Sequence, residues 1–257
     1  MRHRAFGVAR SPESFWPHQP KLESGMPGAG PIPIVIAGFS SDQLTPTLPL
    51  QIANRIGAQI VEGAFAPGDR LKETVFADAF DVSRATIREA LRILHSRGLV
   101  HIQPQRGAQV TQLSTKELED FFEIRAVLLG LGSRRAASLR SEADLVQLQQ
   151  RLKVMEACRD DLDAYFRVSG AMVADVMRIS GSLALIAYID EFAQRIGRYV
   201  RLGLTSSARR RMSVREWRRL LGAITARDGD LAEQLHRSLA LENRRAALAE
   251  FARLHVG

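Results

Sequence analysis

The chain has 257 residues, of which 46% are hydrophobic and 25% are charged. These proportions allow a sizeable core in one large domain or two modest ones, and they exclude a fibrous or wholly disordered protein. The single cysteine, Cys158, excludes an internal disulfide, and no cysteine and histidine spacing suggests a zinc site. A formal net charge of +8 favours a polyanionic partner without identifying it.

The start of the chain has no targeting segment of a recognisable kind. Its longest apolar run, residues 32–39, contains Pro33 and is far shorter than the roughly 20 residues of a membrane span. The basic first residues are not followed by the apolar core and cleavage site of a secretory signal. We therefore expect a cytoplasmic protein with no membrane partner.

Residues 1–47 are rich in proline and glycine and have no sustained helical or strand period. This composition predicts a disordered N-terminal arm that is dispensable for folding. Met26 is an alternative start, which would leave the upstream residues outside the natural protein.

The next part of the chain predicts three helices and a hairpin. Apolar residues recur at helical spacing over residues 52–61 and again over 75–80. Ser83 is a suitable N-cap for a third helix that ends at Gly98. Residues 99–102 and 108–110 then predict two strands joined by a turn. This layout is typical of a winged helix-turn-helix.

The rest of the chain is predicted to be entirely helical. Ser114 and Glu117 have the spacing of a capping box at the start of this region. The predicted helices cover about residues 115–139, 142–157, 161–179, 182–203, 213–227 and 229–254, with a loop at Thr205–Arg211. We expect a six-helix bundle whose core includes two apolar stripes, Phe122/Val127/Leu131 and Leu145/Leu148/Leu152.

Several motifs occur in the order found in one known family. The runs at Pro67–Leu71, Val82–Leu91 and Gly98–Val100 resemble the GntR family of bacterial transcription regulators, and Gln105–Val110 resembles the wing of that family. Phe122–Arg125 resembles the start of the all-helical effector domain in its FadR-like (FCD) branch. The resemblance covers about residues 48–255 and is more specific in the first half.

The resemblance implies a mainly α protein with three parts. These are an N-terminal arm (residues 1–47), a winged helix-turn-helix with a small β-hairpin wing (48–112), and an all-α, six-helix, FCD-like effector-binding domain (113–257). It also implies a homodimer, expected to be a repressor, that binds a pseudo-palindromic double-stranded DNA operator. A small metabolite bound in the helical domain would modulate the affinity for the operator.

Two arginines are the candidate base-reading residues. Arg84 and Arg88 lie one turn apart near the start of the third helix, where a recognition helix presents side chains to the major groove. Each can donate two hydrogen bonds to guanine O6 and N7. The alternative is a solvated charged face in which Arg88 pairs with a nearby acid.

Further candidates lie beside these arginines and in the wing. Ser83 and Thr86 are expected to bind phosphate oxygens at the positive end of the helix dipole. Arg106 lies at the tip of the predicted hairpin beside Gly107, whose missing side chain allows a close approach to the DNA.

The family resemblance places a metal site in the helical domain, but this chain lacks most of the ligands. FCD domains hold a metal with an aspartate, a histidine one turn later and two histidines from later helices. These positions fall on Asp163, Arg167, Trp217 and Leu239, so that a single donor remains. We therefore predict no metal and no cofactor. His236, three residues before Leu239, is a weak substitute.

Charge suggests what replaces the metal. Arg167 and Arg125 could bind the carboxylate of a small organic acid, with Asp163 and Trp217 in the same pocket. The alternative is that Asp163 and Arg167 form an ion pair at i, i+4 and, with Trp217, fill the cavity. If the cavity is filled in this way, the protein is expected to be a regulator that binds DNA constitutively.

A different class of function, a helical enzyme using Asp163, His236 or Cys158, is disfavoured because no catalytic motif accompanies these residues. Cys158 is interpreted instead as a small core residue. The basic run Arg209–Arg211 is interpreted as a solvated loop.

Overall fold

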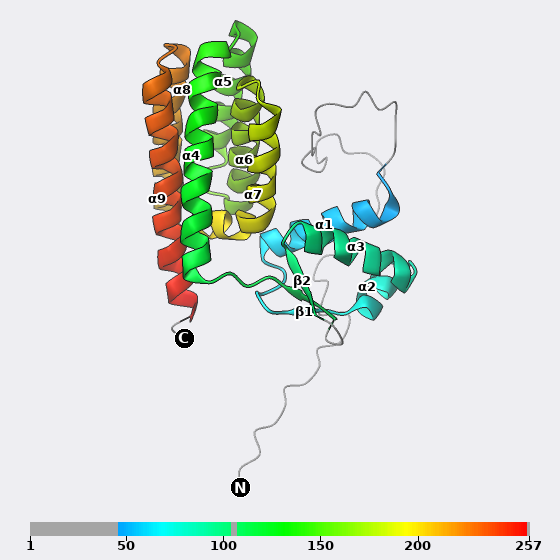
Figure 1. Ribbon diagram of the computed structural model, residues 1–257. Coiled ribbons are helices and arrows are strands. Elements are labelled where there is room, and N and C mark those ends of the chain that lie inside the picture. Colours follow the sequence, from blue (N-terminus) through cyan, green and yellow to red (C-terminus); the bar gives the residue numbers. More distant parts are fainter. Residues whose placement is uncertain (1–45, 104–106, 256–257) are drawn as a thin grey trace. The chain divides into compact units, whose positions relative to one another are not determined.

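A computed structural model describes residues 46–103 and 107–255 (Figure 1). The predicted N-terminal arm, apart from its last two residues, and the predicted wing-tip residue Arg106 lie outside this range. In the described residues the protein is mainly helical, with three short strands in its first half. The predicted fold class is therefore confirmed.

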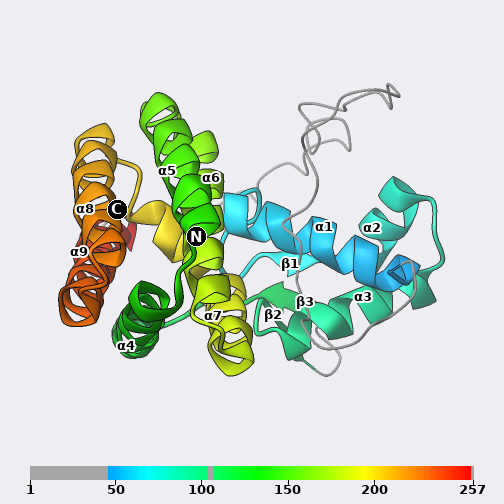
Figure 2. The same ribbon diagram turned by 90° about the horizontal axis from the view of Figure 1, so that it is seen from above.

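The first half of the described chain has three helices, α1 (Leu48–Glu62), α2 (Glu73–Phe80) and α3 (Arg84–Ser96). Figure 2 shows the small sheet near one end of α1 and α3, and α2 near their other end. The helix α1 ends at Gly63, whose φ of 90° lies in the left-handed region that favours glycine. Apolar residues from all three helices and the sheet share one core, in which Ile56, Ile87 and Leu94 are completely buried.

The sheet contains one more strand than the sequence predicts. Its strands are β1 (Arg70–Leu71), β2 (Val100–Gln103) and β3 (Gly107–Val110). The order is β1-β3-β2, and both pairings are antiparallel, with Arg70 opposite Gln109 and Val100 opposite Val110. The predicted hairpin is β2 and β3, and the two-residue β1 is too short to show a period in the sequence.

The second half is a bundle of helices. They are α4 (Thr115–Leu139), α5 (Glu142–Ala157), α6 (Leu162–Ile179), α7 (Leu183–Leu202), α8 (Ser207–Thr225) and α9 (Gly229–His255). The predicted capping box of Ser114 and Glu117 is present at the start of α4. The helix α4 packs against α6, α7, α8 and α9, and it runs beside α9 over most of its length (Figure 1).

One of the two predicted core stripes is wrong in part. Leu145, Leu148 and Leu152 are buried as expected, and so is Phe122. Val127 and Leu131, however, are 48% and 43% exposed. Their helical spacing correctly indicates a face of α4, but no helix of the described chain covers that face.

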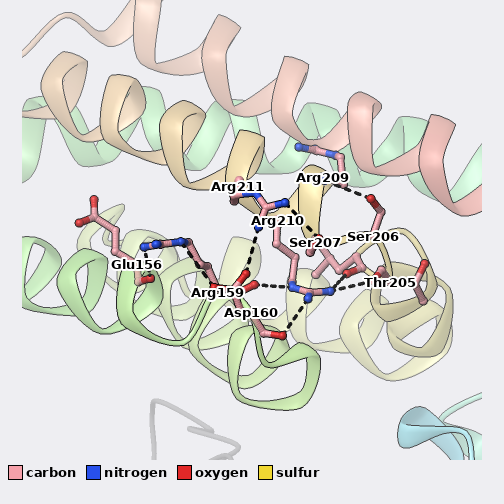
Figure 3. A network of polar contacts seen from close by, with 10 residues as sticks. Glu156, Arg159, Asp160, Thr205, Ser206, Ser207, Arg209, Arg210 and Arg211 are labelled. Carbon is pink, nitrogen blue, oxygen red and sulfur yellow. Dashed lines mark hydrogen bonds and ion pairs between the residues drawn. The ribbon is translucent and has the colours of Figure 1, made fainter.

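The predicted loop at Thr205–Arg211 is also wrong, because α8 begins at Ser207. Arg209 and Arg210 are buried in its first turns and Arg211 is exposed. Figure 3 shows the side chain of Arg210 directed at the two chain segments beside α8. A run of three arginines thus forms part of the packed helical domain and not a solvated loop.

Within the described ranges, no helix has both the length and the apolar character needed to cross a membrane.

Candidate nucleic-acid interface and effector site

A three-residue turn joins α2 to the candidate recognition helix α3. The helix α2 ends at Phe80, and Asp81 adopts a left-handed φ of 51°. The Val82 N–H then donates to the Ala77 carbonyl at 3.0 Å, which closes the end of α2. This short turn is the connection that a helix-turn-helix requires.

Two hydroxyls close the first turn of α3. Ser83 is the N-cap, and its Oγ accepts a hydrogen bond from the Thr86 backbone N–H at 3.1 Å. The two hydroxyl oxygens are 2.9 Å apart and share a hydrogen bond. Both predicted phosphate-binding side chains therefore hold the helix start, where the positive end of the helix dipole favours an anion.

Arg84 and Arg88 both point to solvent from α3. In the part of the chain that the structure describes, Arg84 forms no hydrogen bond or ion pair. Arg88 has a partner that the sequence analysis did not name. Its Nε and Nη2 donate to Oε1 and Oε2 of Glu73, at 3.2 and 3.0 Å.

Glu73 is the first residue of α2, so the ion pair connects the two helices of the motif. The hydrogen bonds from Arg88 lower the pKa of the Glu73 carboxyl below its usual value, and Arg84 lowers it further. The same hydrogen bonds raise the pKa of Arg88. Arg88, a candidate base-reading cation, is therefore oriented and partly neutralised by Glu73. This contact agrees with the alternative in which Arg88 pairs with a nearby acid.

The wing is described only on either side of its tip. Gly107 begins β3 with a φ of 80°, a conformation that favours glycine, and a Cβ atom there would meet no neighbouring atom. The described residues therefore leave room for a side chain at this position.

In the helical domain, a buried polar cluster joins three helices. His236 on α9 is 1% exposed, and its Nδ1 lies 2.6 Å from Oγ of the fully buried Ser133 on α4. The ring of the buried Trp217 on α8 meets the His236 ring edge to face, with centroids 5.0 Å apart. His236 is therefore fixed by packing and by a hydrogen bond.

The electrostatics of this cluster are cationic. Burial, with a smaller contribution from Arg125, lowers the pKa of His236 to about 3, so the imidazole is neutral at pH 7. Burial also lowers the pKa of Arg125 to about 10, which still leaves the guanidinium charged. Arg125 has no hydrogen bond or ion pair with any described residue. Arg125 is thus a partly buried cation that has no counter-ion among the described residues.

Two predicted effector residues do not join this cluster. Asp163 is exposed on α6 and accepts hydrogen bonds from Nε and Nη2 of Arg201, at 3.0 and 2.6 Å. Arg167 is exposed and forms no hydrogen bond or ion pair with Asp163. The predicted Asp163–Arg167 ion pair is wrong because Arg201, from the neighbouring α7, takes the carboxylate. Arg125 and Trp217, by contrast, both lie around His236.

The residues at the family's metal positions do not fit a metal. Trp217 packs its ring on His236, Leu239 is an apolar core residue, and Asp163 is bound to Arg201. No group of three or more histidine, cysteine, aspartate or glutamate side chains with metal-site geometry exists among the described residues. A divalent cation beside Arg125 would lack donors and would be repelled.

His236 and Ser133 were the residues that the sequence analysis missed as part of the site. His236 carried a weak signal as a helical histidine near Leu239, whereas a serine within a helix gives none. Cys158 is partly buried against the core, and burial raises the pKa of its thiol, which disfavours the reactive thiolate.

Comparison with known proteins identifies both halves of the chain. The family model described as bacterial regulatory proteins, gntR family, matches residues 48–110, and the FCD domain model matches residues 120–242. The HTH-type transcriptional repressor RspR of Escherichia coli K12 is 30% identical over 196 residues, which cover 75% of this chain and 86% of RspR.

A second curated relative and two solved structures extend the comparison. The regulator YdhC of Bacillus subtilis 168 is 35% identical over 118 residues, which cover 46% of this chain and about half (52%) of YdhC. The structure of E. coli McbR/YncC matches 80% of this chain and 100% of its own, with a TM-score of 0.71 and 22% identity. A GntR regulator from Rhodococcus sp. RHA1 matches 78% of this chain and 97% of its own, with a TM-score of 0.65 and 21% identity.

The structural matches show the same fold, and the RspR match extends across both domains. The chain therefore belongs to the gntR family of bacterial regulatory proteins, with a helix-turn-helix DNA-binding domain followed by an FCD effector-binding domain.

Proposed function

We propose that the protein is a homodimeric repressor that reads a pseudo-palindromic operator with Arg84 and Arg88 and loses or gains affinity when a small organic acid binds beside Arg125. The observation that carries the first part is the pair of exposed arginines at the capped start of α3. A chromosomal operator makes the cytoplasm the site of action, and the proposal includes no catalytic reaction.

Several contacts support the proposed reading surface. Ser83 and Thr86 hold the first turn of α3, so that the arginine side chains leave a fixed backbone near the positive end of the helix. Arg84 is free to bind a base, whereas Arg88 is turned by Glu73 and still has Nη1 available. The Gly107 region, with Arg106 beside it in the sequence, is proposed to approach the adjacent minor groove or backbone.

The test compares operator binding with binding to random DNA by fluorescence anisotropy. Loss of one guanine contact reduces discrimination by roughly 5- to 150-fold per half-site, so we expect at least that loss for Arg84→Ala and Arg88→Ala. Arg92→Ala is the matched control because Arg92 is exposed on the same helix and pairs with Glu89. Wild-type discrimination in both test variants would refute the assigned reading surface.

The proposed effector is an anion because Arg125 offers a partly buried, permanent cation beside neutral hydrogen-bonding groups. A carboxylate would supply the counter-ion that Arg125 lacks, and a planar guanidinium can bind it through two hydrogen bonds. Neutral His236 and Trp217 would line the site, and no metal is needed to hold the acid. Asp163 and Arg167 are left out because they lie on the exposed side of α6.

Thermal unfolding with a panel of small mono- and dicarboxylates tests this part. An acid at about 100 times its Kd stabilises the folded protein by about 2.7 kcal/mol, and we expect that shift to disappear in Arg125→Gln and persist in Arg167→Gln. Chelators should change neither the Tm nor the affinity for DNA. A stoichiometric divalent metal in the purified protein would contradict the metal-free site.

The second candidate is a regulator whose pocket is filled by its own side chains. The edge-to-face packing of Trp217 on His236 favours it, because these rings occupy the space between α8 and α9. This candidate predicts that no acid in the panel changes the Tm or the affinity for DNA.

A further inference from the structure

The helix α8 carries a row of arginines along its outer side. Their positions are i, i+4, i+7 and i+8, which places all four on one side of the helix. The row extends over about 12 Å, because each residue adds about 1.5 Å to the length of a helix. These exposed residues, here called the α8 stripe, are Arg211, Arg215, Arg218 and Arg219.

Two of the four charges have no counter-ion. Arg215 and Arg219 form no hydrogen bond or ion pair with any described residue. The single acid of α8, Glu216, does not compensate them, because its carboxylate is bound to the buried Arg209 at 3.3 Å. The outer side of α8 is therefore a cationic surface to which the helix itself contributes no free carboxylate.

The other two arginines have partners that a polyanion can replace. Arg211 binds Asp160 at 3.1 Å, and Arg218 binds Glu156 across to α5. The two arginine side chains are 50% and 58% exposed. Ion pairs at such exposed positions contribute little to stability, so that exchange of a carboxylate for another anion costs little.

The stripe lies on a fixed and accessible backbone. The inner side of α8 is buried in the bundle through residues such as Val214, Trp217 and Leu220, and it packs against α4, α5 and α9. Just beyond the last arginine, Gly222 is exposed, and a Cβ atom there would meet no atom within 4 Å. The described chain therefore leaves this end of the stripe open to a close approach by a partner.

We propose that the α8 stripe binds the phosphate backbone of double-stranded DNA, independently of the base sequence. One strand of B-DNA presents a phosphate about every 3.4 Å along the helix axis, so that a stripe of about 12 Å spans three to four phosphates. Each guanidinium can bind a phosphate through two parallel hydrogen bonds. This second DNA-binding surface lies in the effector domain and goes beyond the proposed reading surface on α3.

Other polyanionic partners fit the stripe less well. A helix that binds an anionic membrane inserts an apolar side, whereas the apolar side of α8 is buried in the bundle. Met212, 43% exposed, is the one large apolar residue exposed on α8. An acidic protein would need an apolar or aromatic centre in the interface, which the stripe lacks. The helix-turn-helix of the same chain also raises the local concentration of DNA.

The first test is a salt titration of binding to a long random duplex. Each lost phosphate contact lowers the slope of log K against log salt by about 0.9, so Arg215→Gln/Arg219→Gln should lose about 1.8 per bound stripe. Its affinity at about 0.1 M salt should fall by at least about 10-fold. Arg245→Gln/Arg253→Gln is the matched control, because it removes the same charge from exposed arginines of α9. Equal slopes for the two double variants would overturn the proposal.

Two further measurements keep the test clear of folding defects. Arg215→Lys/Arg219→Lys keeps both charges and should retain the wild-type slope, which a loss caused by misfolding would not predict. After Cys158→Ser, a photoactivatable cross-linker on Gly222→Cys should attach to the duplex. The same reagent on Leu183→Cys should not, since Leu183 is 57% exposed but lies on α7. Equal cross-linking at the two positions would contradict the placement of DNA on the stripe.

Operator discrimination separates this inference from the proposed function. Because the stripe binds only phosphates, Arg215→Gln/Arg219→Gln should lower the affinities for operator and for random DNA by the same factor. Wild-type discrimination after Arg84→Ala and Arg88→Ala refutes the reading surface and leaves the stripe intact. Unchanged binding of random DNA by the glutamine variant overturns the stripe and leaves the reading surface intact.

A vesicle assay decides between DNA and a membrane. Flotation with vesicles that contain phosphatidylserine should show no binding that depends on Arg215 and Arg219. Vesicle binding that is lost in Arg215→Gln/Arg219→Gln, together with an unchanged affinity for DNA, would assign the stripe to a membrane and overturn the proposal.

Discussion

Replacing Arg210 should destabilise the helical domain far more than replacing its neighbour Arg211. The Arg210 guanidinium is buried and donates to four main-chain carbonyls (Figure 3). Nε binds the Arg159 carbonyl at 2.6 Å, Nη2 the Asp160 carbonyl at 3.0 Å, and Nη1 the Leu204 and Thr205 carbonyls at 2.7 and 2.8 Å. These carbonyls follow the ends of α5 and α7, where helix dipoles favour a cation.

The magnitude follows from this geometry. A hydrogen bond to a charged group contributes about 1.5–3 kcal/mol, and unpaired buried carbonyls add a desolvation cost that water entering the space would partly relieve. Loss of such a buried network typically costs about 3–5 kcal/mol, which we expect for Arg210→Ala. Arg211 binds Asp160 at 3.1 Å with both side chains at least half exposed, so Arg211→Ala should cost no more than about 0.5 kcal/mol.

Urea unfolding followed by tryptophan fluorescence provides the assay. The chain has two tryptophans, and in a Trp16→Phe background Trp217 reports on the helical domain alone. Arg210→Lys should lie between the other variants because an ammonium keeps the charge but cannot reach all four carbonyls. Free energies of unfolding for Arg210→Ala and Arg211→Ala that agree within about 1 kcal/mol would refute the reasoning, since that difference is well below the expected cost.

Three other predictions concern the DNA-reading and effector sites. Glu73→Gln should release Arg88 and thereby raise the affinity for random DNA. The salt dependence of that affinity should become steeper by about one counter-ion per recognition helix, and an unchanged slope in a salt titration would contradict this prediction. The lowered pKa of His236 should cost stability as the pH falls from about 6.5 towards 3, by up to about 1.4 kcal/mol per pH unit, because only the unfolded chain then binds the proton. The free energy of unfolding, measured at several pH values, should therefore decrease more steeply with falling pH for wild type than for His236→Gln. Equal pH dependences for the two proteins would contradict this prediction. Ser83→Ala should lower the free energy of unfolding, measured in urea, by about 1 kcal/mol, because the N-cap hydrogen bond is lost. An unchanged free energy of unfolding would contradict this prediction and show that another group caps α3.

The winged helix-turn-helix could be predicted from the sequence because its signals are local. The Ser83 N-cap, the apolar period of α3 and the strand pair after Gly98 all act within a few residues of one another. The Arg88 contact with Glu73 spans 15 residues and two helices, so the sequence could indicate only that an acid was available. The local sequence pattern predicted the position of Arg88, whereas a tertiary contact determines that Glu73 is its partner.

The misplaced start of α8 shows how composition can mislead. A run of arginines is usually solvated, and that expectation predicted a loop at residues 205–211. In the structure Ser206 caps α8, and Arg210 is satisfied by carbonyls from two distant turns. No sequence period marks these acceptors, because any residue can supply a main-chain carbonyl.

The helical domain shows the same limit at the level of packing. Apolar spacing predicted a core-facing stripe from Phe122 to Leu131, but only Phe122 is buried, and Val127 and Leu131 are exposed. A period of 3.6 residues shows that a face is to be covered, but it does not say whether another helix of the same chain or a second chain covers it. Val127 and His236 show this in opposite ways. Val127 is apolar and exposed, whereas His236 is polar and is enclosed by helices far away in the sequence. Both positions are therefore determined by long-range packing, which leaves no local signal in the sequence, whereas the helix-turn-helix has such a signal.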